Sequence, residues 1–210
     1  MEETLKNLLY KIKEIFLRYG IKSVTMDDLA RELGMSKKTL YQYVNDKNEL
    51  VDKIVSLEIE GRKCEFGEIY NRNLNAIEEV FEVNKHVLKM LKESSPAAGY
   101  DLKKYYPDLF AKVQETRRNQ MLDSIINNIK KGKAEGMYRE EVNEEIIARI
   151  NVARFENLLN TDIFQPEEYN SKAFIREVLI YHIRGISNER GIEILQERLK
   201  DFDEYIQSIK

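Results

Sequence analysis

Residues 35–50, MSKKTLYQYVNDKNEL, hold the side chains of this sequence that are best suited to chemistry. On a helix that starts at Ser36, a turn of 100° per residue gives an outer side carrying Lys37, Lys38, Tyr41 and Gln42. Ammonium and phenol groups bind phosphate oxygens, and a glutamine amide can pair with an adenine edge through two hydrogen bonds. These residue types therefore indicate contact with a nucleic acid.

The segments before this stretch must hold it in place, because two turns of helix are not stable alone. Thr25 is a typical N-cap for a second helix that ends at Gly34, and Ser36 caps a third helix that we expect to reach about Val44. Leu40 falls on the inner side of this third helix. Two short helices joined by a glycine have the spacing of a helix–turn–helix unit.

Apolar residues recur with helical spacing along the rest of the chain. A first helix precedes Gly20, and Asp46 caps a fourth helix that begins at Lys47. The later helices are predicted near residues 74–94, 107–132, 143–160, 171–186 and 190–208. The fold class is therefore all-α, with a head of three short helices and a C-terminal bundle of longer ones.

Composition excludes several classes of protein. Hydrophobic residues make up 42% and charged residues 34%, as in soluble globular proteins, and no apolar stretch is long enough to span a membrane. The acidic, amphipathic N-terminus is not that of a secreted protein, and the single Cys64 cannot form an internal disulfide. We expect a cytoplasmic protein without a membrane partner.

The charge distribution is compatible with a polyanionic partner despite a net charge of −3. Residues 1–50 hold nine Lys and Arg against eight Asp and Glu, whereas the remainder holds 25 against 29. DNA binding requires a favourable electrostatic field only at the surface that lies close to the phosphates, so a negative net charge does not exclude it.

Catalytic patterns are missing from the sequence. Two His and one Cys allow no HExxH zinc motif and no paired cysteines, and neither a phosphate-binding glycine loop nor a nucleophile elbow is found. We therefore expect no enzyme activity, no metal site and no cofactor.

Residues 25–50, TMDDLARELGMSKKTLYQYVNDKNEL, resemble the DNA-binding head of the TetR family of bacterial regulators, and the resemblance covers about residues 10–55. It implies that the LYQYV run is the recognition helix and that a lysine at the start of the fourth helix contacts a phosphate. Carried over by position, the expected DNA-contacting residues are Thr25, Ser36, Lys37, Lys38, Thr39, Tyr41, Gln42, Tyr43 and Lys47. Tyr43 lies on the inner edge by its helical position, although the resemblance implies a phosphate contact; a tyrosine can satisfy both.

The same resemblance implies a division into a helix–turn–helix DNA-binding domain, residues 1–46, and a helical ligand-binding and dimerisation domain, residues 47–210. A homodimer through helices in about 143–208 would present two heads to a palindromic double-stranded DNA operator. Polar and aromatic residues on helices expected to line the bundle are candidates for binding a small-molecule effector: His86, Met90, Tyr106, Phe110, Gln114 and Arg118. The helix break at Pro107 is a hypothetical gate.

The sequence thus predicts a sequence-specific transcriptional regulator, a repressor released from its operator by a small molecule. Two alternatives remain open. One is a helical ligand-binding protein whose head has lost specific DNA binding, and the other is a non-specific architectural DNA binder.

Overall fold

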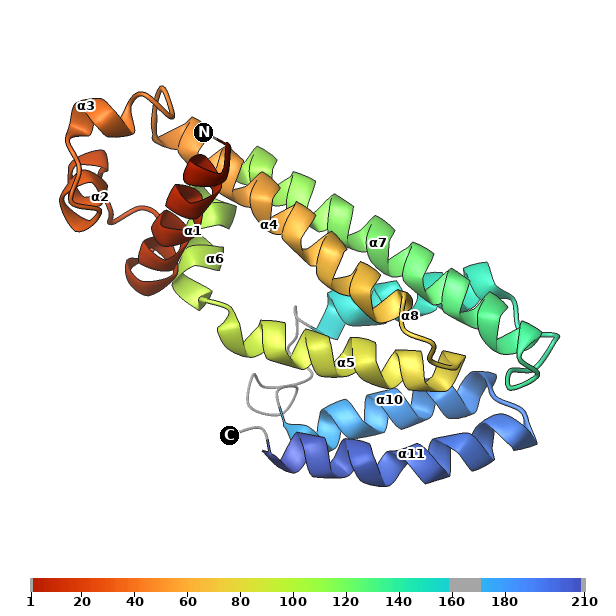
Figure 1. Cartoon of the computed structure of the whole chain (residues 1–210). Coiled ribbons are helices and arrows are strands. Elements are labelled where there is room, and N and C mark those ends of the chain that lie inside the picture. Colours follow the sequence, from red (N-terminus) through yellow and green to blue (C-terminus); the bar gives the residue numbers. More distant parts are fainter. Residues whose placement is uncertain (1, 159–170, 209–210) are drawn as a thin grey trace. The chain divides into compact units, whose positions relative to one another are not determined.

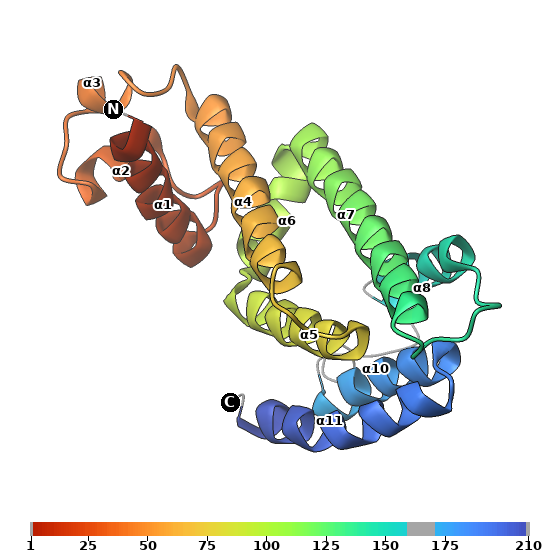
Figure 2. The ribbon, with the colours of Figure 1, turned by 45° about the vertical axis from the view of Figure 1, so that its right-hand side comes forward.

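The computed structural model describes residues 2–158 and 171–208, and its regular structure there is helical apart from one isolated bridge between Tyr138 and Ser187 (Figures 1 and 2). The helices are α1 (Glu2–Tyr19), α2 (Met26–Glu32), α3 (Lys37–Leu40), α4 (Lys47–Tyr70), α5 (Ala76–Glu93), α6 (Pro96–Tyr105), α7 (Pro107–Ala134), α8 (Glu144–Leu158), α10 (Lys172–Ile186) and α11 (Glu189–Ser208). The prediction of an all-α chain with a helix–turn–helix head and a helical bundle is confirmed for the described residues.

Packing divides the chain into two compact units. The head unit comprises Met1–Gly67 and Lys89–Thr116, and the tail unit comprises Glu68–Leu88 and Arg117–Lys210. The division into residues 1–46 and 47–210 is one of function rather than of packing, and it stays a prediction.

The core of the head unit is built from apolar residues of α1, α2, α3 and α4. Ile12, Leu29, Leu40 and Leu50 are almost completely buried there, and α6 and the start of α7 pack Leu102 and Leu109 against them. Burying a leucine or isoleucine side chain contributes about 2 kcal/mol. The one-turn helix α3 is therefore held by Leu40 and the core, as its length requires.

The tail unit combines an apolar core with a buried polar network. Ile77, Phe81, Ile129, Ile183 and Phe202 belong to its core, and the rings of Phe81 and Phe202 lie 5.1 Å apart. The antiparallel pair α10 and α11 supplies much of this surface (Figure 2).

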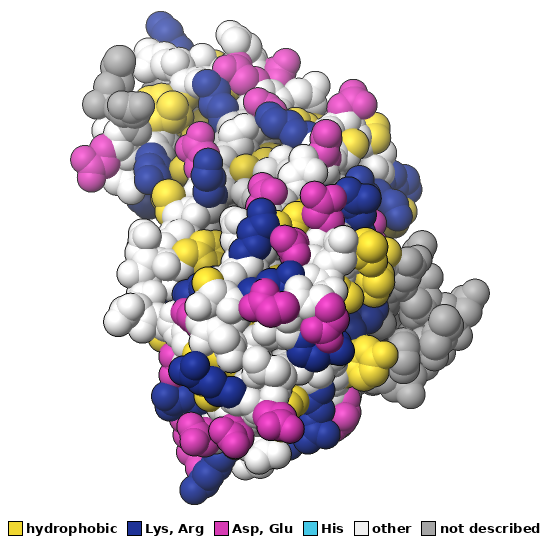
Figure 3. Space-filling view, turned by 90° about the vertical axis from the view of Figure 1, so that its right-hand side faces the viewer, with side chains coloured by type: hydrophobic (Ala, Val, Ile, Leu, Met, Phe, Trp, Pro, Cys, Tyr) yellow, Lys and Arg dark blue, Asp and Glu magenta, His cyan; other side chains and the backbone are white. Residues whose placement is uncertain are grey.

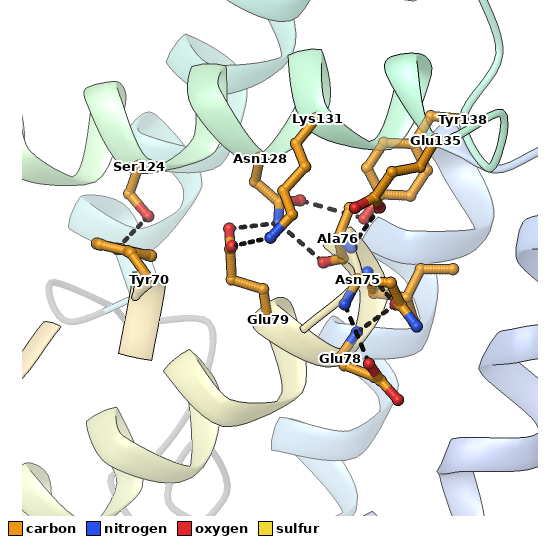
Figure 4. Close-up of polar contacts among 11 residues, drawn as sticks. Tyr70, Asn75, Ala76, Glu78, Glu79, Ser124, Asn128, Lys131, Glu135 and Tyr138 are labelled. Carbon is orange, nitrogen blue, oxygen red and sulfur yellow. Dashed lines mark hydrogen bonds and ion pairs between the residues drawn. The ribbon is translucent and has the colours of Figure 1, made fainter. Parts of the chain in front are cut away.

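The polar network connects α5 to α7 (Figure 4). The Asn128 amide donates to Glu79 at 2.9 Å and to the Ala76 carbonyl at 2.8 Å, and Lys131 pairs with Glu79 at 2.7 Å. The buried Tyr138 hydroxyl donates to Asn128 at 3.1 Å. Because these groups have partners, their burial does not carry the full cost of desolvation.

The surface carries charges of both signs. Figure 3 shows basic and acidic side chains interspersed on one face, rather than a field of one sign. No helix among the described residues is both long and apolar enough to cross a membrane.

Candidate nucleic-acid interface

Thr25 is the N-cap of α2, as predicted, and Asp28 completes a capping box that was not predicted from the sequence. The Thr25 hydroxyl oxygen accepts from the Asp28 amide at 3.1 Å, while Asp28 accepts from the Thr25 amide at 3.0 Å and from its hydroxyl at 2.6 Å. The hydrogen bond from the Thr25 side chain is the first cause that lowers the pKa of Asp28. A phosphate contact by Thr25 therefore requires its hydroxyl to change partner, and this contact stays a prediction.

The chain reverses between α2 and α3 at Gly34, whose φ of +64° lies in the left-handed region. The Gly34 amide donates to the Arg31 carbonyl at 3.1 Å, and the Met35 amide donates to the Ala30 carbonyl at 3.0 Å. This pair of bonds is the Schellman motif, which satisfies the last carbonyls of a helix. It lets α3 begin only a few residues later.

Helix α3 is shorter than predicted, because it ends at Leu40 instead of about Val44. The amides of Gln42 and Tyr43 bond to carbonyls only three residues back, as in a tight turn. Asp46, as the cap of α4, accepts from the Glu49 amide at 2.8 Å and needs non-helical backbone. Little room is left for a second turn of α3.

Three of the predicted contact residues are exposed in and just after α3. Lys38, Tyr41 and Gln42 make no hydrogen bond or ion pair through their side chains within the described part of the chain, and Tyr41 is 41% exposed. The structure thus places these three side chains near one another, where each can donate hydrogen bonds to a binding partner.

Three other predicted residues are engaged at the start of α3. The Ser36 hydroxyl oxygen accepts from the Thr39 amide at 3.0 Å, and it lies 2.7 Å from the Thr39 hydroxyl oxygen. Lys37 pairs with Asp27 of α2 at 2.6 Å, and this contact raises the pKa of Lys37. The sequence shows Asp27 only as a charge in the first turn of α2, so its link to α3 was missed.

Tyr43 and Lys47 are less exposed than Lys38, Tyr41 and Gln42. Tyr43 is half-buried against the core of the head unit, in agreement with its helical position. The half-buried Lys47 ammonium donates to the carbonyls of Ile21 and Val24. Burial and then the nearby Lys22 lower the pKa of Lys47. No sequence signal indicates this contact, because the partners lie 23 and 26 residues upstream.

The six predicted effector residues are divided between the two units. Met90, Tyr106, Phe110 and Gln114 belong to the head unit, whereas His86 and Arg118 belong to the tail unit. Arg118 pairs with Glu156 at 2.7 Å, and Tyr106 packs against the core of the head unit. The effector site stays a prediction.

Two surface hollows of the tail unit include none of these six residues. One of about 470 Å³ is lined by Asn73, Leu74, Asn75, Glu78, Glu135, Met137 and Arg190. The other, of about 200 Å³, lies between the start of α10 and the end of α11. Both are open to solvent, and in the second the Arg176 side chain pairs with Asp203 at 2.7 Å.

Comparison with known proteins finds a family pattern in the head and one related protein. The sequence pattern of "Bacterial regulatory proteins, tetR family" matches residues 8–54. A helix–turn–helix transcriptional regulator of Bacillus subtilis (strain 168), YvaF, is 37% identical over 87 residues, which are 41% of this chain and 46% of that protein. The match thus spans about half the length of that relative.

Solved structures resemble the chain over a larger part of its length. A transcriptional regulator from Cytophaga hutchinsonii aligns with a TM-score of 0.68 and 21% identity, over 89% of this chain and 98% of that one. A gamma-butyrolactone receptor, described as ArpA-like, aligns with a TM-score of 0.61 and 13% identity, over 95% and 97%. At these identities the likeness concerns the fold.

Proposed function

Since the chain belongs to the TetR family of bacterial regulatory proteins, we propose that it is a sequence-specific DNA-binding transcriptional regulator of the cytoplasm. The observation that carries this proposal is the exposed set Lys38, Tyr41 and Gln42 on a helix–turn–helix whose caps and turn are satisfied. Lys38 and Tyr41 bind phosphates, and Gln42 reads an adenine edge in the major groove. Ser36, Lys37, Thr39, Thr25 and Tyr43 complete the proposed contacts.

The proposed assembly is a homodimer through the tail unit. Ile146 and Ile150 of α8 are each 55% exposed, and Tyr181 of α10 is 75% exposed. Arg154 of α8 acts electrostatically on His182 and Tyr181, so the two helices are neighbours on this side. An exposed apolar face on adjacent helices supports a two-fold interface. The predicted range 143–208 includes residues 159–170, which lie outside the described residues.

The proposed regulation is repression relieved by a small molecule. One solved structure that this chain resembles is named a gamma-butyrolactone receptor. The similarity of the two folds supports a ligand-binding role for this chain. Tyr106, Phe110 and Gln114 recur at intervals of four along the end of α6 and the start of α7, and they remain the best candidates in the head unit. An effector shifts the DNA-binding equilibrium only by its different affinity for the two states.

The test is equilibrium binding of the full chain to palindromic DNA from upstream of its own gene and to random DNA, over a range of salt concentrations. We expect specific binding at least about a thousandfold tighter than random binding. Lys38→Ala should lower the salt slope by about one, and Gln42→Ala should reduce discrimination at one base pair. Lys200→Ala, on the exposed side of α11, is the matched control.

Two outcomes would contradict the proposal. Equal affinity for palindromic and random DNA would indicate the architectural alternative. Tight binding of a small molecule without any DNA binding would indicate a ligand-binding protein with an inactive head.

A further inference from the structure

The turn between α1 and α2, residues 20–24, is held from two sides by side chains that lie far away in the sequence. All of the groups involved belong to the head unit. The turn leads directly into Thr25 and α2, whose end fixes α3 through the Gly34 turn. The position of this turn therefore affects where the proposed DNA-contacting side chains lie.

Helix α6 holds the turn through Asp101. Its Oδ2 atom accepts from the Lys22 amide at 2.8 Å. Gly20 has a φ of +84°, and a Cβ atom added there would lie 3.0 Å from the same Oδ2. The Lys22 ammonium lies 4.8 Å above the Tyr105 ring, also in α6. The carboxylate thus sits closely against the backbone of the turn.

Helix α4 holds the turn through Lys47, its first residue. The ammonium donates to the carbonyls of Ile21 and Val24, and it lies 3.5 Å from the Lys22 carbonyl oxygen. It also lies 5.9 Å from the centre of the Phe16 ring. An ammonium has three hydrogens to donate, so these carbonyls compete directly with any phosphate for it.

We propose that Asp101 and Lys47 are positioning residues for DNA binding: they fix the α1–α2 turn, and neither contacts DNA. The proposal rests on the proposed DNA-binding function and assigns a control point within it. Movement of either α4 or α6 would loosen the turn and shift α2. Because α6 ends beside the predicted effector residue Tyr106, the Asp101 contact gives an effector a short route to the DNA-binding helices.

Whether replacing Asp101 weakens or strengthens DNA binding distinguishes a positioning role from a purely electrostatic one. Removing an anion from a protein that binds a polyanion strengthens binding if only charge matters. If Asp101 positions the turn, Asp101→Ala weakens binding to the palindromic DNA by about fivefold or more, since charge-assisted hydrogen bonds are among the strong ones. Asp101→Asn, which retains an acceptor oxygen, keeps the wild-type affinity within about twofold. Asp108→Ala, an exposed acid at the start of α7, is the control.

The salt dependence of DNA affinity shows whether Lys47 holds the α1–α2 turn or contacts a phosphate. Lys47→Met should weaken binding without changing the salt slope, whereas Lys38→Met lowers the slope by about one. Lys47→Arg retains donors for the carbonyls and should restore part of the lost affinity. Exchange of the Lys22 amide hydrogen, followed by NMR, should become faster in Asp101→Ala than in the wild type.

Several results would overturn the inference. Unchanged or tighter binding by Asp101→Ala would show that its carboxylate does not position the turn, and a slope lowered by about one in Lys47→Met would show a phosphate contact. If Asp101→Ala does not fold, the charge-neutral change Gly20→Ala perturbs the same contact, and wild-type affinity in that variant counts against the proposal. Absence of DNA binding in the wild type would instead contradict the proposed function.

Discussion

At the scale of single residues, two glycines differ in what a methyl group would meet. A Cβ atom on Gly132 of α7 would lie 2.1 Å from the ring of Tyr138, which is buried. Apart from its two chain neighbours and the backbone of its own helix, Gly61 of α4 has no atom within 4 Å of the same position. The first glycine is therefore required by packing, and the second is not.

We expect Gly132→Ala to lower the free energy of unfolding by about 2 kcal/mol or more, because the ring and α7 must separate. Gly61→Ala, the matched control, should raise it by about 0.5 kcal/mol, since alanine favours a helix interior. Urea denaturation followed by circular dichroism measures both. Equal stability of the two variants would contradict the close contact between Gly132 and Tyr138.

His182 of α10 makes stability depend on pH. Burial, and then the nearby Arg154 guanidinium, lower the pKa of His182 from 6.5 to about 4. The unfolded chain therefore binds a proton more readily than the folded one, and stability falls as pH drops from 6.5 towards 4. At about 1.4 kcal/mol for each pKa unit, the full effect is roughly 3 kcal/mol.

Between pH 7 and pH 5, we expect wild type to lose about 2 kcal/mol more stability than His182→Gln, whose side chain does not titrate. Chemical denaturation at several pH values measures this difference. Parallel pH profiles for the two proteins would mean that His182 is accessible to water in the folded state.

At the scale of elements, local signals predicted the caps and the glycine turns of the head. Thr25, Ser36 and Asp46 are caps in the structure as predicted, and Gly20 and Gly34 adopt positive φ. Each of these features depends on bonds to residues no more than five positions away. The end of α3 lies earlier than predicted, at Leu40, because the cap of α4 at Asp46 needs non-helical backbone soon after it.

Contacts between distant residues could not be predicted in the same way. Asp101 lies 79 residues from Lys22, and Lys131 lies 52 residues from Glu79. The sequence pattern of an amphipathic helix does not distinguish a charged residue that faces water from one that pairs with another helix. The candidate DNA-contacting residues were therefore found by pattern, whereas the groups that hold them in place were found only in the structure.

The buried network between α5 and α7 gives a prediction for these elements. Lys131 neutralises Glu79, which is only 6% exposed. Lys131→Met should destabilise the chain by about 2 kcal/mol, because it leaves a buried carboxylate without its cation. Lys130→Met, at an exposed neighbouring position of α7, is the control and should change stability by less than about 0.5 kcal/mol.

Thermal and urea unfolding of both variants at neutral pH measure the difference. The double variant Lys131→Met with Glu79→Gln should recover part of the lost stability, since no buried charge then lacks a partner. A destabilisation by Lys130→Met as large as that by Lys131→Met would show that the Glu79 contact is not responsible.

At the scale of the whole molecule, DNA recognition and assembly depend on different units. The proposed DNA-contacting residues lie in the head unit, and the exposed apolar face of α8 and α10 lies in the tail unit. A single head with one short recognition helix contacts few base pairs. Two heads joined by a symmetric interface read two half-sites, so the affinity for a palindrome should depend on dimerisation.

This dependence can be tested by placing a charge in the exposed apolar face. Ile150→Glu would bury a carboxylate without a partner in the proposed interface, so we expect a monomer in sedimentation equilibrium at concentrations where wild type is a dimer. Leu91→Glu, at an exposed position of α5 outside the face, is the matched control and should remain dimeric. The monomer should bind a single half-site as wild type does but lose the tight binding to the palindrome, at least about a hundredfold. A dimeric Ile150→Glu variant with unchanged affinity would exclude this face as the interface, while loss of half-site binding would show that the change disturbs the head as well.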